Sequence, residues 1–390
     1  MPPATILQIV PTLSTGGAER TTLDIAAALA ARGHRALVAS EGGELERELV
    51  EAGGTLLCFP SATKNPFRIF ANAFRLESLI RREGIALVHA RSRAPAWSAL
   101  MAARRTRVPF VTTYHGIYDQ ESALKGLYNS VMARGDVVIA NSGRTAEIIR
   151  SRHNTVGDRL AVVHRGIDLR AFEPARIDPS RVAALRAAWK VRPGEAVILQ
   201  LARLTGWKGQ EVTIAGFASL ARRGNTDVRL VLAGDAQGRD GYADRLAAAV
   251  AQAGLGGHVV IPGRVAAADV PAAMTAADAV VVASTGEEGF GRAAVEAQAA
   301  GKPLIVSGQG ALLETVVAPP DAPATLRTGW RVPPGDAEAL ADALAETLAL
   351  APHQRVALAI RARANAANFS LQQMTDATLQ IYGRLLGRKL

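Results

Sequence analysis

Short apolar runs recur along the chain, and a turn and a helix-like stretch follow each of them. Their length and their content of β-branched residues are typical of strands buried on both faces, as in parallel sheets covered by helices. In the first half of the chain we expect strands at 5–10, 35–40, 86–90, 110–115, 137–140 and 160–164. In the second half we expect them at 196–202, 228–234, 258–263, 279–284 and 303–308.

Two successive sets of strands and helices predict an α/β protein with two doubly wound domains. A chain of 390 residues is also too long for one ordinary core. The division should lie in 165–180, which contains two prolines and no strand pattern. We therefore expect domains at 1–170 and 171–369, followed by an amphipathic helix at 370–390 that precedes no strand.

Composition and charge narrow the class of protein. Cys58 is the only cysteine, which excludes intramolecular disulfides and metal clusters that need several thiolates. The N-terminus lacks the basic region of a signal peptide, and no apolar run reaches the roughly 18–20 residues that span a bilayer. We therefore expect a cytoplasmic protein. Its net charge of +10 should attract anions, whether nucleotides, nucleic acid or an acidic membrane face.

A glycine pair follows the first expected strand. In open parallel sheets ligands bind outside the carboxyl ends of the strands. Gly16 and Gly17 allow close backbone approach there, and the helix that follows offers its N-terminal N–H groups to an anion. The pattern is not G-x-G-x-x-G, so the dinucleotide fingerprint is absent. Alone, the pair is more typical of an ordinary strand–helix turn.

Two cations follow the strand at 196–202. Arg203 and Lys208 are five residues apart across a glycine-containing loop, so both can reach one ligand group. A forked guanidinium and a compact ammonium together suit a diphosphate. Taken without other signals, the two side chains are equally compatible with solvated surface cations.

Two glutamates lie between an apolar strand and an alanine-rich helix. Glu288 directly precedes Gly289, Phe290 and Gly291, which predicts a loop, whereas Glu296 should lie in the second or third turn of the helix. A carboxylate there can accept hydrogen bonds from a vicinal diol, as an acidic residue does with ribose in dinucleotide folds. Two solvated acids are the weaker interpretation. A glycosidase pair would normally flank one bond from different elements.

In this context the chain resembles the retaining glycosyltransferases of the GT-B fold, in particular family 4. The segment 288–303 looks like that family's E-x7-E signature. Further matches follow in the family's order: 16–20, 114–116, 165–168, 202–209, 310–316 and 329–336. The resemblance implies two Rossmann-like parallel-sheet domains that face each other across a cleft, an acceptor side in 1–170 and a nucleotide-sugar donor domain in 171–369. It also implies that 370–390 returns to the N-terminal domain.

The resemblance implies roles for individual residues. Arg203 and Lys208 would hold the donor diphosphate and stabilise its charge as it leaves, in place of a metal ion, so we expect no metal and no cofactor. Glu288 would bind hydroxyls of the donor sugar, Glu296 would bind the ribose, and His115 would contact the sugar near its anomeric carbon. The other expected donor-binding residues are Gly16, Gly17, Gly289, Phe290, Gly291, Arg264 and Val265.

The chain departs from the family pattern at Arg165. The family has N-G-[IV]-D where this chain has Arg165-Gly166-Ile167-Asp168, which adds a cation near the expected hinge. This departure leaves the donor sugar and base open, but it leaves the reaction class unchanged.

A basic segment bears on the acceptor. The stretch 64–107 holds ten Lys or Arg residues and only two acids. Phe67, Phe70 and Phe74 would share one face of a helix at 65–82. An anionic membrane surface or a lipid-linked acceptor would suit this segment, although packing of the rings onto the sheet is the somewhat stronger interpretation. We expect transfer to a saccharide or lipid-linked acceptor of the cell envelope, such as lipopolysaccharide, compatible with a peripheral position at the inner face of the plasma membrane.

Other function classes remain as alternatives. A GT-B enzyme with a soluble acceptor, such as a nucleotide-sugar epimerase or a disaccharide synthase, would turn over without lipid. A non-catalytic nucleotide- or nucleic-acid-binding protein would fit the charge. However, the chain lacks nucleic-acid motifs and stacking aromatic clusters, so we expect no nucleic-acid partner. A nicotinamide oxidoreductase is disfavoured because neither domain has the glycine fingerprint.

Overall fold

The computed structural model describes residues 2–14, 16–118, 122–154, 156–236, 238 and 240–390. The chain forms two compact units. Unit 1 comprises Met1–Gly166 together with Leu371–Leu390, and unit 2 comprises Ile167–Ser370. The division therefore lies inside the stretch 165–180, and the last helix belongs with the N-terminal sheet.

Unit 1 is built on a seven-stranded parallel sheet in the order β3-β2-β1-β4-β5-β6-β7. The strands are β1 (Thr5–Ile9), β2 (Arg35–Ser40), β3 (Thr55–Cys58), β4 (Leu87–Ala90), β5 (Phe110–Tyr114), β6 (Val137–Ala140) and β7 (Leu160–Val162). The six strands expected from apolar runs are present. The edge strand β3 was not expected, because it is short and none of its side chains is fully buried.

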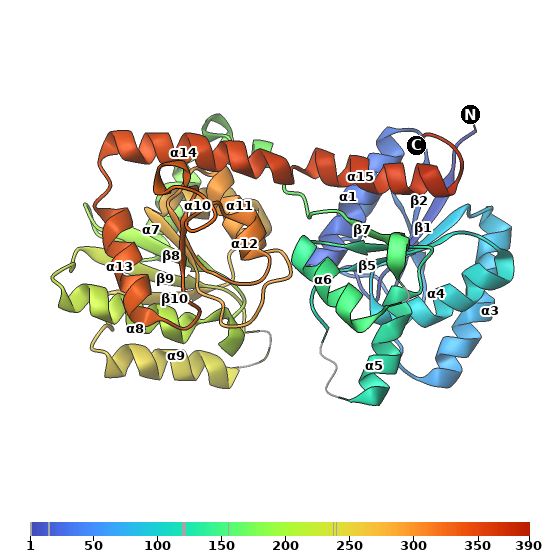
Figure 1. Ribbon diagram of the computed structural model, residues 1–390, viewed down its shortest axis with the longest axis horizontal. Helices are drawn as coiled ribbons and strands as arrows, with labels where there is room; N and C mark the ends of the chain where they lie inside the picture. The colour runs from blue at the N-terminus through green and yellow to red at the C-terminus, as the bar shows by residue number, and fades with distance from the viewer. Residues whose placement is uncertain (1, 15, 119–121, 155, 237, 239) are drawn as a thin grey trace. The chain divides into compact units, whose positions relative to one another are not determined.

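Helices cover both faces of this sheet. They are α1 (Gly17–Ala31), α2 (Glu46–Glu51), α3 (Pro66–Glu83), α4 (Arg93–Thr106), α5 (Ala123–Asn129), α6 (Gly143–Arg152) and α15 (Leu371–Leu385). One apolar cluster joins the sheet to α1, α2 and α15, and another joins it to α3, α4 and α6. The C-terminal helix α15 packs beside α1 (Figure 1), so it completes the core of unit 1.

Unit 2 has a six-stranded parallel sheet in the order β10-β9-β8-β11-β12-β13. The strands are β8 (Ala196–Leu201), β9 (Val228–Ala233), β10 (Val259–Gly263), β11 (Ala279–Val282), β12 (Leu304–Ser307) and β13 (Trp330–Val332). The five expected strands are present. The sixth, β13, was not expected, because Arg331 interrupts its three residues and leaves no continuous apolar run.

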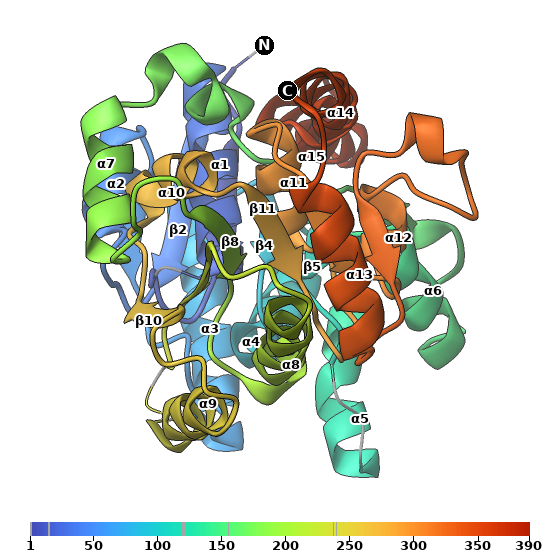
Figure 2. The ribbon, with the colours of Figure 1, turned by 90° about the vertical axis from the view of Figure 1, so that its left-hand side faces the viewer.

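Two layers of helices enclose this second sheet. They are α7 (Pro179–Ala188), α8 (Gln210–Arg222), α9 (Asp240–Gln252), α10 (Val270–Ala276), α11 (Arg292–Ala299), α12 (Leu312–Thr315), α13 (Ala337–Leu348) and α14 (Pro352–Ala366). Helices α8, α9 and α13 share one apolar cluster with the sheet, and α10, α11 and α14 share the other. Figure 2 shows β8 and β11 between these two layers.

Each sheet has one point at which the strand order reverses: successive strands are first added on one side of the first strand and then on its other side. In unit 1 the strands run outward from β1 through β2 to β3, and then from β4 in the opposite direction. In unit 2 the same reversal falls between β8 and β11. The crevice outside the carboxyl ends of strands at such a point is where ligands of doubly wound folds bind. The expected doubly wound α/β fold is therefore confirmed.

A buried histidine joins α15 to the sheet of unit 1. The Nδ1 atom of His89 lies 2.5 Å from the hydroxyl of Tyr382, and its Nε2 atom lies 2.7 Å from the hydroxyl of Thr113. All three residues are buried. Burial lowers the pKa of His89 well below its ordinary value of 6.5, and the nearby charge of Arg91 acts in the same direction. His89 is therefore a neutral hydrogen-bonding element of the core.

The neutral state of His89 predicts a pH-dependent stability. As the pH falls through about 6.5, the unfolded chain binds a proton at this histidine that the folded chain does not, so the free energy of unfolding decreases. The contribution of one histidine is at most about 1.4 kcal/mol per pH unit. Urea unfolding between about pH 5.5 and 7.5 should show a shallower pH slope for His89→Gln than for the wild type.

Tyr382→Phe is the matched control for this measurement. It removes the hydroxyl partner but keeps the titrating ring, so its unfolding free energy should be lower at every pH with an unchanged slope. Equal slopes in the wild type and His89→Gln would contradict the assignment of a neutral His89.

Candidate active site

A buried ion pair occupies the switch point of unit 2. Lys208 ends the short 3-10 turn Gly206–Lys208 after β8, and Glu288 lies in the loop between β11 and α11. The Nζ atom of Lys208 is 2.5 Å from Oε1 of Glu288, and the Ser284 hydroxyl donates to the same oxygen at 2.6 Å. The side chains of Lys208 and Glu288 are only 16% and 8% exposed. The fold thus brings together two expected site residues that are 80 positions apart.

Two glycines permit the loops around this pair to pack closely. Gly209 has a φ of +71°, and a Cβ there would lie 1.8 Å from the carbonyl oxygen of Ala283. Gly310 has a φ of +58°, and its Cβ would lie 2.9 Å from the backbone N and O of Glu288. The loop after β12 is held in place because the Ala311 N–H donates to the Glu288 carbonyl. These close approaches set the position of both charges.

Glu296 lies in the second turn of α11, as its sequence context predicted. The residue is 7% exposed, and the Nε of Arg292 donates to its Oε1 at 2.6 Å. This contact lowers the cost of burying the carboxylate, because a buried charge without a partner is strongly unfavourable. Arg292 was not expected at the site, although a cation four residues before a glutamate on a helix is a readable signal. Ser284 was not expected either, because only the folding of the loop brings it to Glu288.

The other cationic candidates of unit 2 share the same sheet edge. Arg203 is exposed at the start of the loop that leads to Lys208, and its carbonyl accepts a hydrogen bond from Gln210. Arg264 and Val265 follow β10, which is two strands away from β8 at the edge of the sheet. Arg264 is exposed and Val265 is half-buried. All three residues therefore lie beyond the carboxyl ends of strands.

Phe290 has a different environment from its glycine neighbours. Its ring is 3% exposed and packs against Phe369 with 5.7 Å between the ring centroids. Gly291, with a φ of +77°, begins α11, and a Cβ on it would lie 2.4 Å from Leu312. The ring of Phe290 therefore belongs to the core and is not available to a ligand.

In unit 1, the expected residues follow β1 and β5. Gly16 and Gly17 begin α1, and His115 follows Tyr114 at the carboxyl end of β5. His115 as a whole is partly exposed, but both ring nitrogens are buried and form no hydrogen bond with any described residue. Burial, followed by the charges of Arg165 and Arg91, lowers the pKa of His115 well below 6.5. The imidazole is therefore neutral and able both to donate and to accept.

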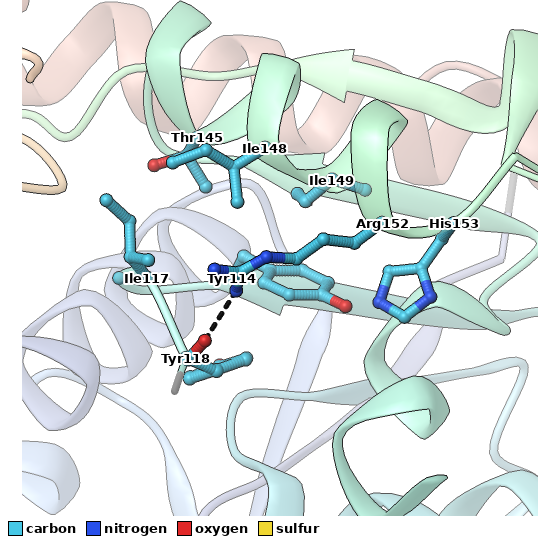
Figure 3. Close-up of a pocket in the computed structure, with 9 residues that line it drawn as sticks. Tyr114, Ile117, Tyr118, Thr145, Ile148, Ile149, Arg152 and His153 are labelled. Carbon is cyan, nitrogen blue, oxygen red and sulfur yellow. Dashed lines mark hydrogen bonds between the residues drawn. The ribbon is translucent and has the colours of Figure 1, made fainter. Parts of the chain in front are cut away.

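A small hollow in unit 1 lies between the end of β5 and α6. It is lined mainly by the apolar parts of Tyr114, Tyr118, Ile148 and Ile149, and Arg152 donates to the Tyr118 carbonyl across it (Figure 3). Consecutive residues of a strand point to opposite faces of the sheet. The Tyr114 side therefore differs from the side on which His115 lies, and the hollow is not part of the polar site.

Within the described ranges, no three His, Cys, Asp or Glu side chains form a group that could hold a metal ion. In the same ranges, none of the helices has the length and apolar character needed to cross a bilayer.

Two family models match the chain. Residues 15–171 match the model described as Glycosyltransferase Family 4, and residues 182–365 match Glycosyl transferases group 1. The two matches correspond to the two sheets and include the candidate residues of both units.

Solved structures and curated proteins of similar sequence include proteins named as glycosyltransferases. A glycosyltransferase from Rickettsia africae is 32% identical, with a TM-score of 0.88 over 98% of this chain and 99% of that one. Anabaena HepE in complex with UDP-glucose is 25% identical, with a TM-score of 0.80 over 97% and 99%. The D-inositol 3-phosphate glycosyltransferase of Mycobacteroides abscessus is 28% identical over 81% of this chain and 70% of its own length. The chain spans half the length of the Mycobacterium tuberculosis proteins of that name.

The close approach at Gly209 predicts that adding a single methyl group there will lower the unfolding free energy strongly. Gly209→Ala should cost about 3 kcal/mol or more of unfolding free energy, because the Cβ would collide with the Ala283 carbonyl as well as strain a left-handed backbone. Gly224→Ala is the matched control, since Gly224 also has a positive φ but faces open space. It should cost only about 1 kcal/mol. Equal costs in denaturant unfolding would show that the packing of these loops is not a constraint.

Proposed function

This chain belongs to the group 1 glycosyltransferases of the GT-B fold, and we propose that it transfers a sugar from a nucleoside-diphosphate sugar held by unit 2, with retention of anomeric configuration. The observation that carries the donor assignment is the Lys208–Glu288 pair with Ser284 at the switch point of the second sheet. The binding of UDP-glucose by Anabaena HepE supports the same class of donor. Retention would appear as the same anomeric coupling in the NMR spectra of donor and product.

Lys208 and Arg203 would bind the diphosphate. Negative charge builds up on the leaving diphosphate in the transition state, and preorganised cations stabilise it without any proton transfer. The Lys208 ammonium has three donors, so it can keep its contact with Glu288 while it binds a phosphate oxygen. In this proposal the two cations supply the positive charge, and no divalent metal is required.

The two glutamates would bind different diols of the donor. Lys208 and Ser284 both engage Oε1 of Glu288, which leaves Oε2 without a hydrogen bond to any described residue and available to sugar hydroxyls. Glu296, oriented by Arg292, would accept from the ribose hydroxyls. Arg264, Val265 and the backbone of Gly289–Gly291 would complete the donor site.

Unit 1 offers neutral groups that suit a sugar. The neutral ring of His115 can accept from a sugar hydroxyl without adding charge. The backbone N–H groups at Gly16 and Gly17 would contribute hydrogen bonds from the start of α1.

Donor binding tests this proposal. In titration calorimetry with EDTA present, we expect the protein to bind one nucleoside diphosphate series and its sugar conjugates from a panel of bases. Glu296→Ala should weaken that binding about tenfold or more, because it removes the acceptor of two ribose hydroxyls. Glu338→Ala, which removes an exposed glutamate of α13, is the control and should bind like the wild type. Silence across the panel by the folded wild type would refute the transferase assignment.

The exposed side chains of α3 suggest what kind of acceptor the protein meets. The expectation that its phenylalanines pack onto the sheet is wrong: Phe67, Phe70 and Phe74 are 87%, 58% and 42% exposed. The inward face of the helix is formed instead by Asn72, Ala73, Leu76, Leu79 and Ile80. Periodicity located one face of the helix correctly, but the smaller side chains of the other face are the ones that pack.

Cations accompany these exposed rings. Arg68 and Arg75 are exposed on the same helix, and the Arg105 guanidinium lies 4.8 Å from the Phe74 ring centroid. Not every cation of 64–107 contributes, because Arg91 is buried in the core. Exposed aromatic rings among arginines are typical of surfaces that bind anionic membranes. We propose that α3 places the enzyme on an anionic bilayer that carries its acceptor.

Vesicle co-sedimentation tests the α3 surface. Phe67→Ser with Phe70→Ser should weaken binding to phosphatidylglycerol-containing vesicles about tenfold or more, since each inserted ring is worth about 1.5–3 kcal/mol. Arg68→Glu with Arg75→Glu should weaken it further and remove its salt dependence.

Val356→Ser with Ile360→Ser is the control, because these apolar side chains are also exposed, on a different helix, α14. This pair should leave vesicle binding unchanged. Binding that is equally strong in the α3 variants, or that occurs without anionic lipid, would rule out the proposed contact.

A further inference from the structure

Trp207 is the most exposed of the four tryptophans in the chain. Its relative exposure is 37%, whereas Trp189 and Trp330 are 1% and 7% exposed and Trp97 is half-buried. Exposed apolar side chains are common on protein surfaces, so exposure alone assigns no role to the ring. Its position is more informative, because Trp207 directly precedes Lys208 in the short turn after β8.

The indole of Trp207 lies against the ammonium of Lys208. The Nζ atom is 4.3 Å from the ring centroid, within the distance at which an aromatic face attracts a cation. The same atom is 2.5 Å from Oε1 of Glu288. The Lys208 side chain is only 16% exposed, and a cation–π contact strengthens as the cation loses water. The ammonium is therefore held by two groups, a carboxylate and an aromatic face.

The backbone of Trp207 is tied to the loop that carries Glu288. The Trp207 carbonyl accepts hydrogen bonds from the N–H groups of Thr285 at 2.8 Å and Gly286 at 3.3 Å. The side chain also packs on Gly286, because a Cβ built there would lie 3.4 Å from Cβ and 3.5 Å from Cε3 of Trp207. These contacts fix the indole relative to both members of the ion pair.

The second contact limits the freedom of a flexible side chain. Lysine has a four-carbon stem, and ordering it costs conformational entropy. An ion pair with Glu288 alone would leave the ammonium able to swing around the carboxylate. The indole opposes that movement and keeps water from one side of the charge, which strengthens its electrostatic interactions. The ammonium has three N–H donors, of which the described residues accept one, so donors remain for a phosphate oxygen.

We propose that Trp207 is a positioning residue for the donor diphosphate: its indole face holds the Lys208 ammonium beside Glu288 in the orientation that binds a phosphate oxygen. This proposal rests on the proposed function and adds to it the residue that orients the cation. Trp207 acts through Lys208 and does not itself contact the nucleotide. Stacking of the indole on the base or the sugar is the competing role for an exposed ring at this sheet edge, and the test separates the two.

The test compares two substitutions of Trp207 in the full-length protein. Trp207→Phe keeps an aromatic face, whereas Trp207→Leu keeps only apolar volume. In titration calorimetry with the nucleoside diphosphate that the wild type binds, Trp207→Leu should bind about tenfold more weakly and Trp207→Phe within about threefold of the wild type. Equal losses in both variants, or no loss in either, would overturn the proposal, because packing alone does not depend on the electrons of the ring.

The corresponding nucleoside, which has no phosphates, distinguishes positioning from stacking. Measured by ligand-detected NMR, its binding should be the same in the wild type and Trp207→Leu. A parallel loss for nucleoside and diphosphate would show that the ring contacts the nucleotide directly, and would overturn the action through Lys208. Trp97→Leu is the control, because Trp97 is a half-buried tryptophan of unit 1 with its own cation, Arg134, 5.1 Å from the ring centroid. It should bind both ligands like the wild type.

A double-mutant cycle with Lys208→Met separates this proposal from the one on which it rests. Because Trp207 acts through Lys208, Trp207→Leu should not weaken diphosphate binding further in the Lys208→Met background. Independent, additive losses would overturn the positioning role while the transferase function stands. Failure of the folded wild type to bind any nucleoside diphosphate would refute the transferase function instead.

Discussion

Close backbone approach at the carboxyl ends of β8 and β11 is the constraint on which the candidate active site depends. The positive φ and missing Cβ of Gly209 allow its turn to lie against the carbonyl of Ala283. That contact places Lys208 beside the loop that carries Glu288. A buried ion pair tolerates little displacement, because its attraction must offset the desolvation of both charges. The chemistry of unit 2 therefore depends on two glycine-dependent contacts between loops, which act before any ligand is bound.

Cations of the two units have different partners. In unit 2 the partly buried Lys208 and the exposed Arg292 each contact a buried glutamate. In unit 1 the buried Arg91 donates through Nε and Nη2 to the amide oxygen of Gln8, a neutral partner. Burial lowers the pKa of Arg91, and this effect is opposed first by Tyr382 and then by the charge of Asp24. Lys208 of unit 2 therefore has a carboxylate as its partner, whereas the buried Arg91 of unit 1 has a neutral amide.

The sequence predicts the repeated strand–helix units of this fold. It does not predict burial or hydrogen-bond partners that depend on tertiary contacts. Buried parallel strands are continuous apolar runs, so all but the short strands β3 and β13 could be located. Glycines and charges after strands indicated the candidate site, because parallel strands share one carboxyl edge. Nothing local distinguishes the buried Arg91 from the exposed Arg68, and periodicity alone does not say which face of α3 packs. That the buried amide of Asn141 forms no hydrogen bond with a described residue could not be inferred, since hydrogen-bond partners depend on the neighbouring strands.

The excess of positive charge has a more specific meaning once its positions are known. A net charge of +10 is compatible with any anionic partner. The loop of Lys208 and the outer surface of α3 both carry part of this charge, and their neighbours differ. A carboxylate accompanies Lys208, whereas exposed aromatic rings lie among the cations of α3. These neighbours, rather than the charge itself, favour a nucleoside diphosphate at the first location and a lipid surface at the second.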